Sequence, residues 1–367
     1  MALSKVNPNF VSQLGRRNLV INGAMQVAQR YGYNSAQADW NSYDASDRIF
    51  KRTSGGSTSS VQTRNDDAPS GFTYSDKLTI TSQNSDTYIG RGTSLEWNDI
   101  SHLRAGYSDA KTITLSFWVK ASISGTYCFA YTSYVASHSA SDAATSYVTE
   151  YTVNSANTWE YKTITVTLPT STSSNWDGSN GGNTTGLRLQ WSVSRRATTN
   201  SYETATTDSW ISGNYYCTSS QTNMGATNGS TFQITGVQLE AGDTATPFEH
   251  RSYGEELTLC QRYYEIIGNW ASTSQFYAFP IFKSRSMSIG IPVHFRVQKR
   301  ATPTITSYDR LGTTTGVFTQ ISNGTNLAIQ FGPSSDVNGV YRTQHATQPV
   351  AVTESAYGLK ITVDAEL

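Results

Sequence analysis

One stretch of this chain constrains its fold more than any other, because the spacing of its apolar residues changes partway along it. It covers residues 231–265, TFQITGVQLEAGDTATPFEHRSYGEELTLCQRYYE. Phe232 and Ile234 lie on one face of an expected β-strand, and the alternation then slips by one residue at Gly236. Such a slip at a glycine predicts a β-bulge. We therefore expect a bulged strand that ends at residues 241–243.

A single short helix is expected after this strand. Pro247 blocks a helix directly before it, because the residue before a proline is held in an extended conformation. Ser252 and Glu255 then have the spacing of a capping box. Apolar residues recur afterwards at three- and four-residue spacing: Leu259, Cys260, Tyr263 and Tyr264. This pattern predicts about three turns of amphipathic helix, the only convincing helix of the chain.

The other apolar residues alternate with a period of two. Residues 111–120 show this most clearly, with aliphatic and aromatic residues on one face and Trp118 among Thr, Ser and Lys on the other. Further strands are expected at 18–30, 77–81, 88–90, 126–134, 146–152, 159–168 and 186–193, and then at 289–297, 302–308, 317–321, 327–331 and 357–363. Strands with one apolar face and no helices between them predict an all-β fold. We expect a jelly-roll β-sandwich and a smaller C-terminal β-sandwich, joined by the short helix.

The change of pattern divides the chain into three parts. Residues 1–17 have no apolar period and are expected to be an attachment arm or a frayed terminus. Residues 18–250 are expected to form the jelly-roll domain, and residues 251–367 the short helix and the small β domain. Two polar insertions, 169–185 and 194–230, interrupt the jelly roll and are longer than simple connections between strands.

Composition excludes several classes of protein. The 367 residues carry 27 basic and 27 acidic side chains, and only 15% are charged. Nucleic-acid binding is not expected, because it needs Lys and Arg clustered on one face. No apolar run approaches the length of a membrane span, and the N-terminus lacks the pattern of a signal peptide.

The three cysteines, Cys128, Cys217 and Cys260, are widely spaced, which favours reduced thiols in a protein made in a cytoplasm. A disulfide bridge between Cys128 and Cys217 is the alternative.

The sequence contains no motif that indicates catalysis or a cofactor. The five histidines are scattered, without the spacing of a zinc site, and neither a nucleophile elbow nor a phosphate-binding loop occurs. Asp39, Asp44 and Asp47 could pair as the carboxylates of a glycosidase, but solvated surface acids are the commoner outcome. We therefore expect a protein that is not an enzyme and holds no metal or cofactor.

Aromatic residues in the two polar insertions are the candidate ligand contacts: Trp176, Trp210, Tyr215 and Tyr216. Aromatic rings stack on the C–H faces of sugars, while neighbouring Asn, Asp and Ser side chains bind the hydroxyls. The alternative is that these rings fold back over the sheet or meet a neighbouring subunit, where aromatic residues are also enriched. The sequence favours Trp176 and Trp210 as contacts over the tryptophans that lie on expected strands.

Four segments, spread over nearly the whole chain, carry a resemblance to a known family. They are NLVINGAMQVAQR at residues 18–30, KTITLSFWVKAS at 111–122, QLEAGDTATPFEHRSYGEELTLCQRYYE at 238–265, and KRATPT at 299–304 together with VDAEL at 363–367. These segments resemble tail-fibre and related virion proteins of bacteriophages, particularly marine and cyanobacterial ones. Their order in the chain also matches.

The resemblance implies a bacteriophage virion structural protein, a tail fibre or other external appendage that contacts host surface glycans. The alternative is a head-decoration, head-fibre or tail-adaptor protein with a purely structural role. A glycan depolymerase is the remaining class, but the repetitive β-helix that usually holds the catalytic acids of such tail spikes has no counterpart in this sequence.

Partners and location follow from the same resemblance. The N-terminal arm would bind other virion proteins, the chain would form a homotrimer, and weak sites for host cell-surface polysaccharide would gain avidity from the repeated copies. The protein would be made in the host cytoplasm and carried in the virion. Residues 18–250 are similar to carbohydrate-binding jelly rolls, in which a carboxylate after the first Asn-Gly helps to bind calcium. Ala24 and Gln26 stand there in this chain, which argues against a structural calcium.

Overall fold

The structure of the chain is a computed structural model that describes residues 16–30, 43, 45–55, 59–133, 144–170, 176, 182–197, 202–268, 282–283, 289–290, 293–309, 314–320, 326–331, 336–340, 343–345, 357–358 and 360–366. The chain divides into two compact units. Unit 1 extends to Glu256, and unit 2 comprises Leu257–Glu366. The division therefore falls after residue 256, six residues beyond the boundary expected at 250/251.

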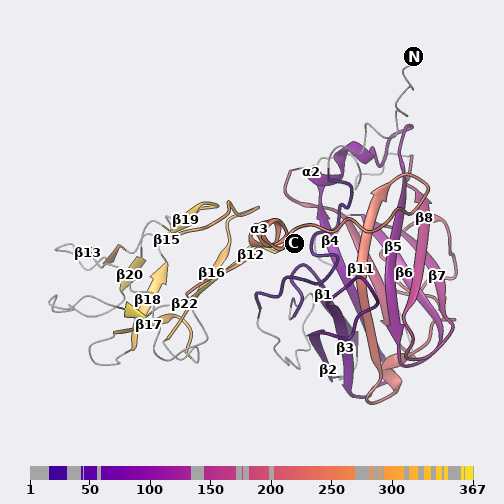
Figure 1. Ribbon diagram of the computed structural model, residues 1–367, viewed down its shortest axis with the longest axis horizontal. Helices are drawn as coiled ribbons and strands as arrows, with labels where there is room; N and C mark the ends of the chain where they lie inside the picture. The colour runs from indigo at the N-terminus through magenta and orange to yellow at the C-terminus, as the bar shows by residue number, and fades with distance from the viewer. Residues whose placement is uncertain are drawn as a thin grey trace. The chain divides into compact units, whose positions relative to one another are not determined.

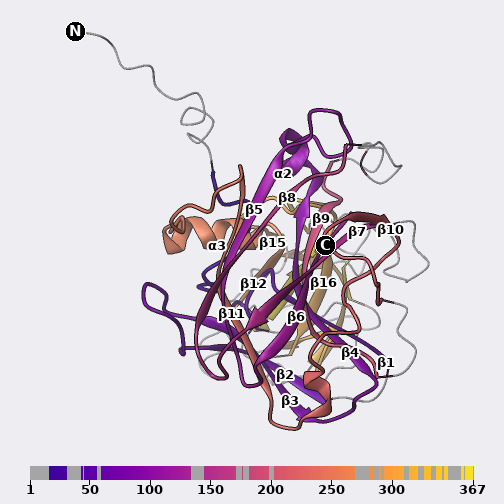
Figure 2. The same cartoon turned by 90° about the vertical axis from the view of Figure 1, so that its right-hand side faces the viewer.

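Unit 1 is a jelly-roll β-sandwich of two antiparallel sheets (Figure 1). The six-stranded sheet has the order β1 (Phe50–Gly55), β4 (Thr87–Glu96), β9 (Thr185–Ser194), β6 (Gly125–Ser133), β7 (Thr145–Val153) and β10 (Trp210–Ser212). The five-stranded sheet has the order β2 (Ser59–Asn65), β3 (Ser75–Ser82), β11 (Thr231–Ala241), β5 (Thr112–Ala121) and β8 (Glu160–Thr167). Strands of both sheets can be followed in Figure 2. The all-β fold class expected from the sequence is confirmed.

Alternate residues of these strands fill the space between the two sheets. Phe117 of β5, Phe129 of β6 and Trp191 of β9 are fully buried there. The ring centroid of Trp191 lies 5.4 Å from that of Phe117 and 5.0 Å from that of Phe129. Such edge-to-face contacts add about 1 kcal/mol per pair to the free energy of burying the rings. Side chains on the outer faces of the sheets are therefore not needed for this core.

The bulge expected at Gly236 is present. The pairing of β11 with β5 shifts register between Thr235 and Gln238. Gly236 has a φ of 61°, in the left-handed region that residues with a Cβ rarely adopt. The bulge therefore depends on glycine at this position.

Residues 18–30, expected as the first strand, form no strand. Asn22 has a φ of 60° and begins a turn, which interrupts the extended conformation that a strand requires. The segment nevertheless lies against β11, where the Val237 amide donates to the Gly23 carbonyl over 2.9 Å. A Cβ added to Gly23 would lie only 2.1 Å from the Val237 oxygen, so this approach requires glycine. The expected strand is wrong, although the expected turn at Asn22-Gly23 is confirmed.

The helix expected after β11 is α3 (Tyr253–Gln261). The amide of Glu255 donates to the Ser252 hydroxyl over 3.3 Å, as the capping spacing predicts. The helix ends about a turn earlier than expected, because Tyr264–Ile267 pairs in a sheet as β12. A second, four-residue helix, α2 (Trp97–Ile100), was not expected. Among the described residues, the helices are too short and too polar to cross a membrane.

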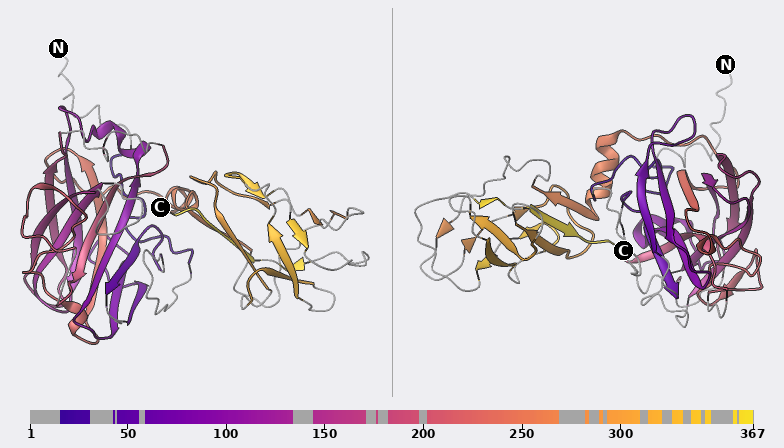
Figure 3. Two further views of the ribbon diagram at one scale, coloured as in Figure 1. Left: turned by 180° about the vertical axis from the view of Figure 1, so that it is seen from behind. Right: turned by 90° about the horizontal axis from the view of Figure 1, so that it is seen from below.

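Unit 2 consists of small antiparallel sheets (Figure 3). The three-stranded sheet is formed by β12, β22 (Lys360–Asp364) and β16 (Thr304–Tyr308). The four-stranded sheet has the order β20 (Thr343–His345), β18 (Asn326–Phe331), β17 (Val317–Gln320) and β21 (Tyr357–Gly358). Two further pairs are β13 (Phe282–Lys283) with β14 (Ile289–Gly290), and β15 (Val293–His294) with β19 (Gly339–Val340). The single strand expected over 289–297 is therefore wrong, because β14 and β15 pair with different partners.

The three cysteines, all among the described residues, are buried thiols that form no disulfide. Burial raises the pKa of the Cys128 thiol to about 11, and the Thr218 hydroxyl only partly opposes this. The thiolate is the reactive form of cysteine, so Cys128 is inert at neutral pH.

Candidate functional site

The outer face of the five-stranded sheet, directed away from the core, presents a pair of aromatic rings. Residues 113, 115, 117 and 119 of β5 are buried in the core, so Trp118 points to the opposite side. Tyr161 of β8 lies directly across from it, with the ring centroids 5.4 Å apart. Trp118 is half-buried, and Tyr161 retains 45% of its surface exposed. A rigid sheet therefore displays two adjacent rings to solvent.

The bulge in β11 extends this pair into a longer row of rings. A Cβ at Gly236 would lie 2.7 Å from the Phe72 ring and 3.0 Å from Trp118, so both rings close over the glycine backbone. The Phe248 centroid is 5.0 Å from that of Phe72, and the exposed His250 lies 5.4 Å from Phe72. We call Tyr161, Trp118, Phe72, Phe248 and His250 the aromatic row.

A polar cluster flanks the aromatic row. The Asp67 carboxylate accepts hydrogen bonds from the Lys120 ammonium at 2.7 Å, the Trp159 indole at 3.1 Å and the Gln233 amide at 3.3 Å. The Lys120 hydrogen bond is the main cause of a lowered Asp67 pKa. The Asp67 side chain is still 41% exposed. An ionised carboxylate with a fixed orientation and an accessible surface can bind the hydroxyl groups of a ligand.

Strand β8, at the edge of the sheet, has a row of threonines next to Tyr161, of which Thr165 and Thr167 are hydrogen-bonded through their hydroxyls to Thr114 and Thr112 of β5. Thr163, Thr165 and Thr167 point outward and are exposed. Lys162 points to the other side of the strand, where its ammonium pairs with Glu160 at 2.7 Å. An inward-pointing charge protects an edge strand from pairing with another strand. The exposed face of β8 is therefore better suited to a ligand than to an added strand.

The structure separates the four residues that the sequence indicated as ligand contacts. Trp176 is fully buried in the core, with its ring edge-on to Trp210 at 5.6 Å. Trp210 is half-buried on β10 and packs at the rim of the same core. Tyr216 is fully buried and Tyr215 half-buried, in a second cluster on the far side of the six-stranded sheet. Distant segments of the chain cover both Trp176 and Tyr216, which agrees with the alternative that these rings fold back over the sheet and not with their projection from polar loops.

The second cluster is a packed layer over the outer face of the six-stranded sheet. The Arg52 guanidinium lies 4.5 Å from the Tyr216 ring centroid and 4.9 Å from that of Tyr202. The Gln190 amide donates to the Tyr88 hydroxyl, and burial holds the Tyr88 pKa well above its usual range. All five side chains are buried. The polar insertion at 194–230 supplies part of this layer.

Trp118 and Tyr161 are not among the candidate contacts expected from the sequence, because tryptophans on strands are expected to pack. The available signal was the position of Trp118 on the polar face of an alternating strand. A large ring at such a position is either covered by another segment or displayed to solvent. Only the position of β8 beside β5 shows that Trp118 has an exposed aromatic neighbour.

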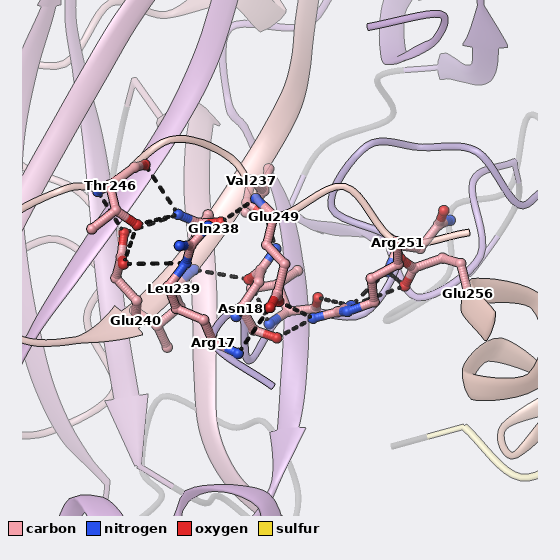
Figure 4. Close-up of polar contacts among 12 residues, drawn as sticks. Arg17, Asn18, Val237, Gln238, Leu239, Glu240, Thr246, Glu249, Arg251 and Glu256 are labelled. Atoms are coloured by element: carbon pink, nitrogen blue, oxygen red, sulfur yellow. Dashed lines mark hydrogen bonds and ion pairs between the residues drawn. The ribbon is translucent and has the colours of Figure 1, made fainter. Parts of the chain in front are cut away.

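Two polar networks lie inside the fold, one in each unit. In unit 1, the network joins residues 17–22 to the end of β11 and the start of α3 (Figure 4). Its members, which we call the polar clamp, are Arg17, Asn18, Asn22, Gln238, Glu240, Thr246, Glu249, Arg251 and Glu256. The network thereby holds residues 17–22 to residues 238–256.

Arg251 connects the polar clamp to two backbone carbonyls and two carboxylates. Its guanidinium donates to the carbonyls of Asn18 and Val20 and pairs with Glu249 and Glu256, each at 3.2 Å. Burial opposes ionisation of Glu249, but the amides of Asn18 and Arg17 and the Arg251 charge outweigh it, so the pKa of the carboxyl is lowered. A boundary at 250/251 would remove Arg251 and Glu256 from the unit that they stabilise.

We predict that Arg251→Lys lowers the free energy of unfolding of unit 1 by about 2 kcal/mol. A lysine ammonium cannot replace the planar guanidinium group, whose nitrogens reach four acceptor groups. Urea unfolding of the full chain, followed by tryptophan fluorescence, measures this change. Arg104→Lys is the matched control, since Arg104 and Asp109 form an exposed pair at 3.1 Å and such pairs contribute little. Equal midpoints for the two variants would contradict the role of the clamp.

A buried ion pair in unit 2 connects β12 to Lys299. The Lys299 ammonium lies 2.7 Å from the Glu265 carboxylate, and both side chains are fully buried. Arg300 donates to the carbonyls of Ala365 and Glu366 at 2.6 and 2.7 Å. Burial lowers the pKa of Lys299, and the Glu265 charge opposes that shift. These contacts join β12, residues 299–300 and residues 365–366 within unit 2.

Comparisons with known proteins give weak structural likenesses. No protein-family model matches the chain, and a search of curated proteins finds no match. The enzymatically active domain of bacteriophage CBA120 tailspike protein 4 is 12% identical, over 61% of this chain and 21% of that one, with a TM-score of 0.32. The CBM22-2 xylan-binding domain of Paenibacillus barcinonensis Xyn10C is 14% identical, over 52% of this chain and 91% of that one, with a TM-score of 0.30.

A family 11 carbohydrate-binding module of Clostridium thermocellum is 12% identical, over 56% of this chain and 95% of that one, with a TM-score of 0.29. The chain thus spans about a fifth of the tailspike structure and most of each binding module. At these scores, the likenesses assign neither a ligand nor a reaction to this chain.

Among the described residues, no group of three or more His, Cys, Asp or Glu could hold a metal ion.

Proposed function

We propose that this chain is a non-enzymatic bacteriophage virion protein, a tail fibre or other external appendage that contacts host surface glycans through unit 1. The glycan contact rests on one observation, the exposed Trp118 and Tyr161 rings beside the polar cluster at Asp67. The virion role rests on the resemblance of the four sequence segments.

The chemistry of the outer face fits a sugar. A sugar ring has C–H faces that pack on aromatic rings and hydroxyls that need hydrogen-bonding partners, and the aromatic row and the polar cluster supply both. The sheet holds these groups in place through its strand pairing. Little conformational entropy is therefore lost when a ligand binds.

Multiple copies would strengthen such a site. A few stacked rings on an open face give weak binding, and a homotrimer carrying the site on each chain raises the overall avidity. The trimer expected from the sequence remains part of this proposal.

In a purely structural role, a neighbouring subunit would instead cover the aromatic row. The inward charge of Lys162 makes β8 a poor edge for such an interface.

We predict that Tyr161→Ala weakens polysaccharide binding about tenfold with little change in melting temperature, because the ring is exposed and its loss removes one stacking surface. Affinity electrophoresis through gels that contain purified bacterial lipopolysaccharides and capsular polysaccharides measures the change. Tyr253→Ala removes another exposed tyrosine, on α3, and should leave mobility unchanged. Unretarded wild-type protein in every gel, or equal retardation of wild type and Tyr161→Ala, would overturn the proposed function.

A further inference from the structure

The aromatic row crosses the strands of the five-stranded sheet. Tyr161 belongs to β8, Trp118 to β5, Phe72 covers Gly236 of β11, and Phe248 follows β11 in the chain. Neighbouring rings approach within 5.4 Å for Trp118 and Tyr161 and 5.0 Å for Phe72 and Phe248. The stacking surface therefore extends over three strands.

The direction along β8 offers a different surface. The residues that share the outward side of β8 with Tyr161 are Thr163, Thr165 and Thr167, which carry no rings. A ligand lying along β8 would stack on Tyr161 alone and then meet a row of hydroxyls. The two directions can thus be distinguished by substitution.

Polar groups lie open on one flank of the aromatic row. Lys120 is two residues from Trp118 on the same face of β5, and its ammonium pairs with Asp67, whose side chain is 41% exposed. Gln233 lies directly across from Lys120 on β11 and is itself buried. On the opposite flank, Ser116 and Gln238 are buried, and the Gln238 amide donates to the Thr246 carbonyl at 3.2 Å. Hydroxyls of a bound ligand would find partners on the Lys120 side.

We propose, building on the function above, that the site binds an internal stretch of an extended polysaccharide that crosses β8, β5 and β11. Successive sugars stack from Tyr161 towards Phe248, and their hydroxyls on one edge bind Lys120 and Asp67. A single terminal sugar would instead need polar groups that enclose it in a pocket. The open row has several rings in line and polar groups along one side.

The test uses the full chain and size-fractionated fragments of whichever lipopolysaccharide O-chain or capsular polysaccharide retards the wild type most. Isothermal titration is expected to show affinity that rises with fragment length. Phe248→Ala should weaken binding of long fragments about fivefold and leave the shortest fragments unaffected, because these reach only Tyr161 and Trp118. Thr165→Ala, on the same strand as Tyr161, should bind as wild type.

The outcomes separate this inference from the proposed function. Loss of binding in Thr165→Ala but not in Phe248→Ala would place the ligand along β8, and affinity independent of length would indicate a terminal sugar. Either result overturns the crossing chain while Tyr161→Ala still weakens binding. Phe248→Leu keeps apolar volume without a ring, so it should behave as Phe248→Ala with an unchanged melting temperature. Unimpaired glycan binding together with a smaller particle mass in these variants would assign the row to a second copy of the chain.

Discussion

Trp176→Ala is expected to lower the free energy of unfolding of unit 1 by about 4 kcal/mol, because it removes a fully buried ring and leaves a cavity. The ring packs edge-on against Trp210, and the backbone at Gly106 approaches so closely that an added Cβ would lie 2.7 Å from the Trp176 Cβ. The surroundings therefore have little freedom to collapse into the space. Urea unfolding monitored by far-ultraviolet circular dichroism measures the change.

Trp159→Ala is the matched control for this experiment. The Trp159 ring is half-buried on the outer face, so its loss should cost clearly less than the loss of Trp176. A negligible effect of Trp176→Ala would restore the interpretation drawn from the sequence, in which this residue projects from a polar loop. The comparison thus tests the largest disagreement between sequence and structure.

Lys299→Met is expected to destabilise unit 2 by about 3 kcal/mol, because Glu265 would lose its closest charged partner while remaining fully buried. The exposed Arg296 would still lie 3.6 Å from the carboxylate and limit the loss. Hydrogen exchange of the amides in β12 and β22 of the full chain measures the change locally. Faster exchange confined to unit 2 is the expected result.

The double variant Lys299→Met with Glu265→Met provides the control for the buried charge. Replacing a whole buried ion pair by apolar side chains is often nearly neutral, so the double variant should recover most of the lost protection. If it is as unstable as Lys299→Met alone, the two substitutions act independently, and the pair is not the source of the effect.

The positions of the strands in unit 1 could be predicted from the sequence because the evidence for them is local. Alternation in residues 111–120 predicts β5 almost to its ends, and the slip at Gly236 predicts the bulge. The alternation in residues 289–297 is equally clear, yet residues 295–297 lie outside any strand, and residues 18–30, also expected as a strand, contain a turn. A strand exists only where a neighbour pairs with it, and the neighbour is set by distant parts of the chain.

The candidate site could not be predicted in the same way. The exposure of an aromatic ring depends on which distant segments lie over it. Trp176, in a polar insertion, is covered completely, whereas Tyr161, on a regular strand, is exposed because β8 forms the edge of its sheet. Local polarity therefore indicated the wrong tryptophan.

By itself, the sequence determined the all-β class, the bulge, the short capped helix and the two-part organisation, since period, capping and proline act within a few residues. Tertiary structure alone decided which rings meet to form the aromatic row and which acids and bases pair in the polar clamp. Asn18 and Glu249 lie 231 positions apart in the chain, yet are joined by one hydrogen bond of 2.8 Å. Contacts at such separation arise from the folding of the whole unit, because no local pattern specifies which distant residues will become neighbours.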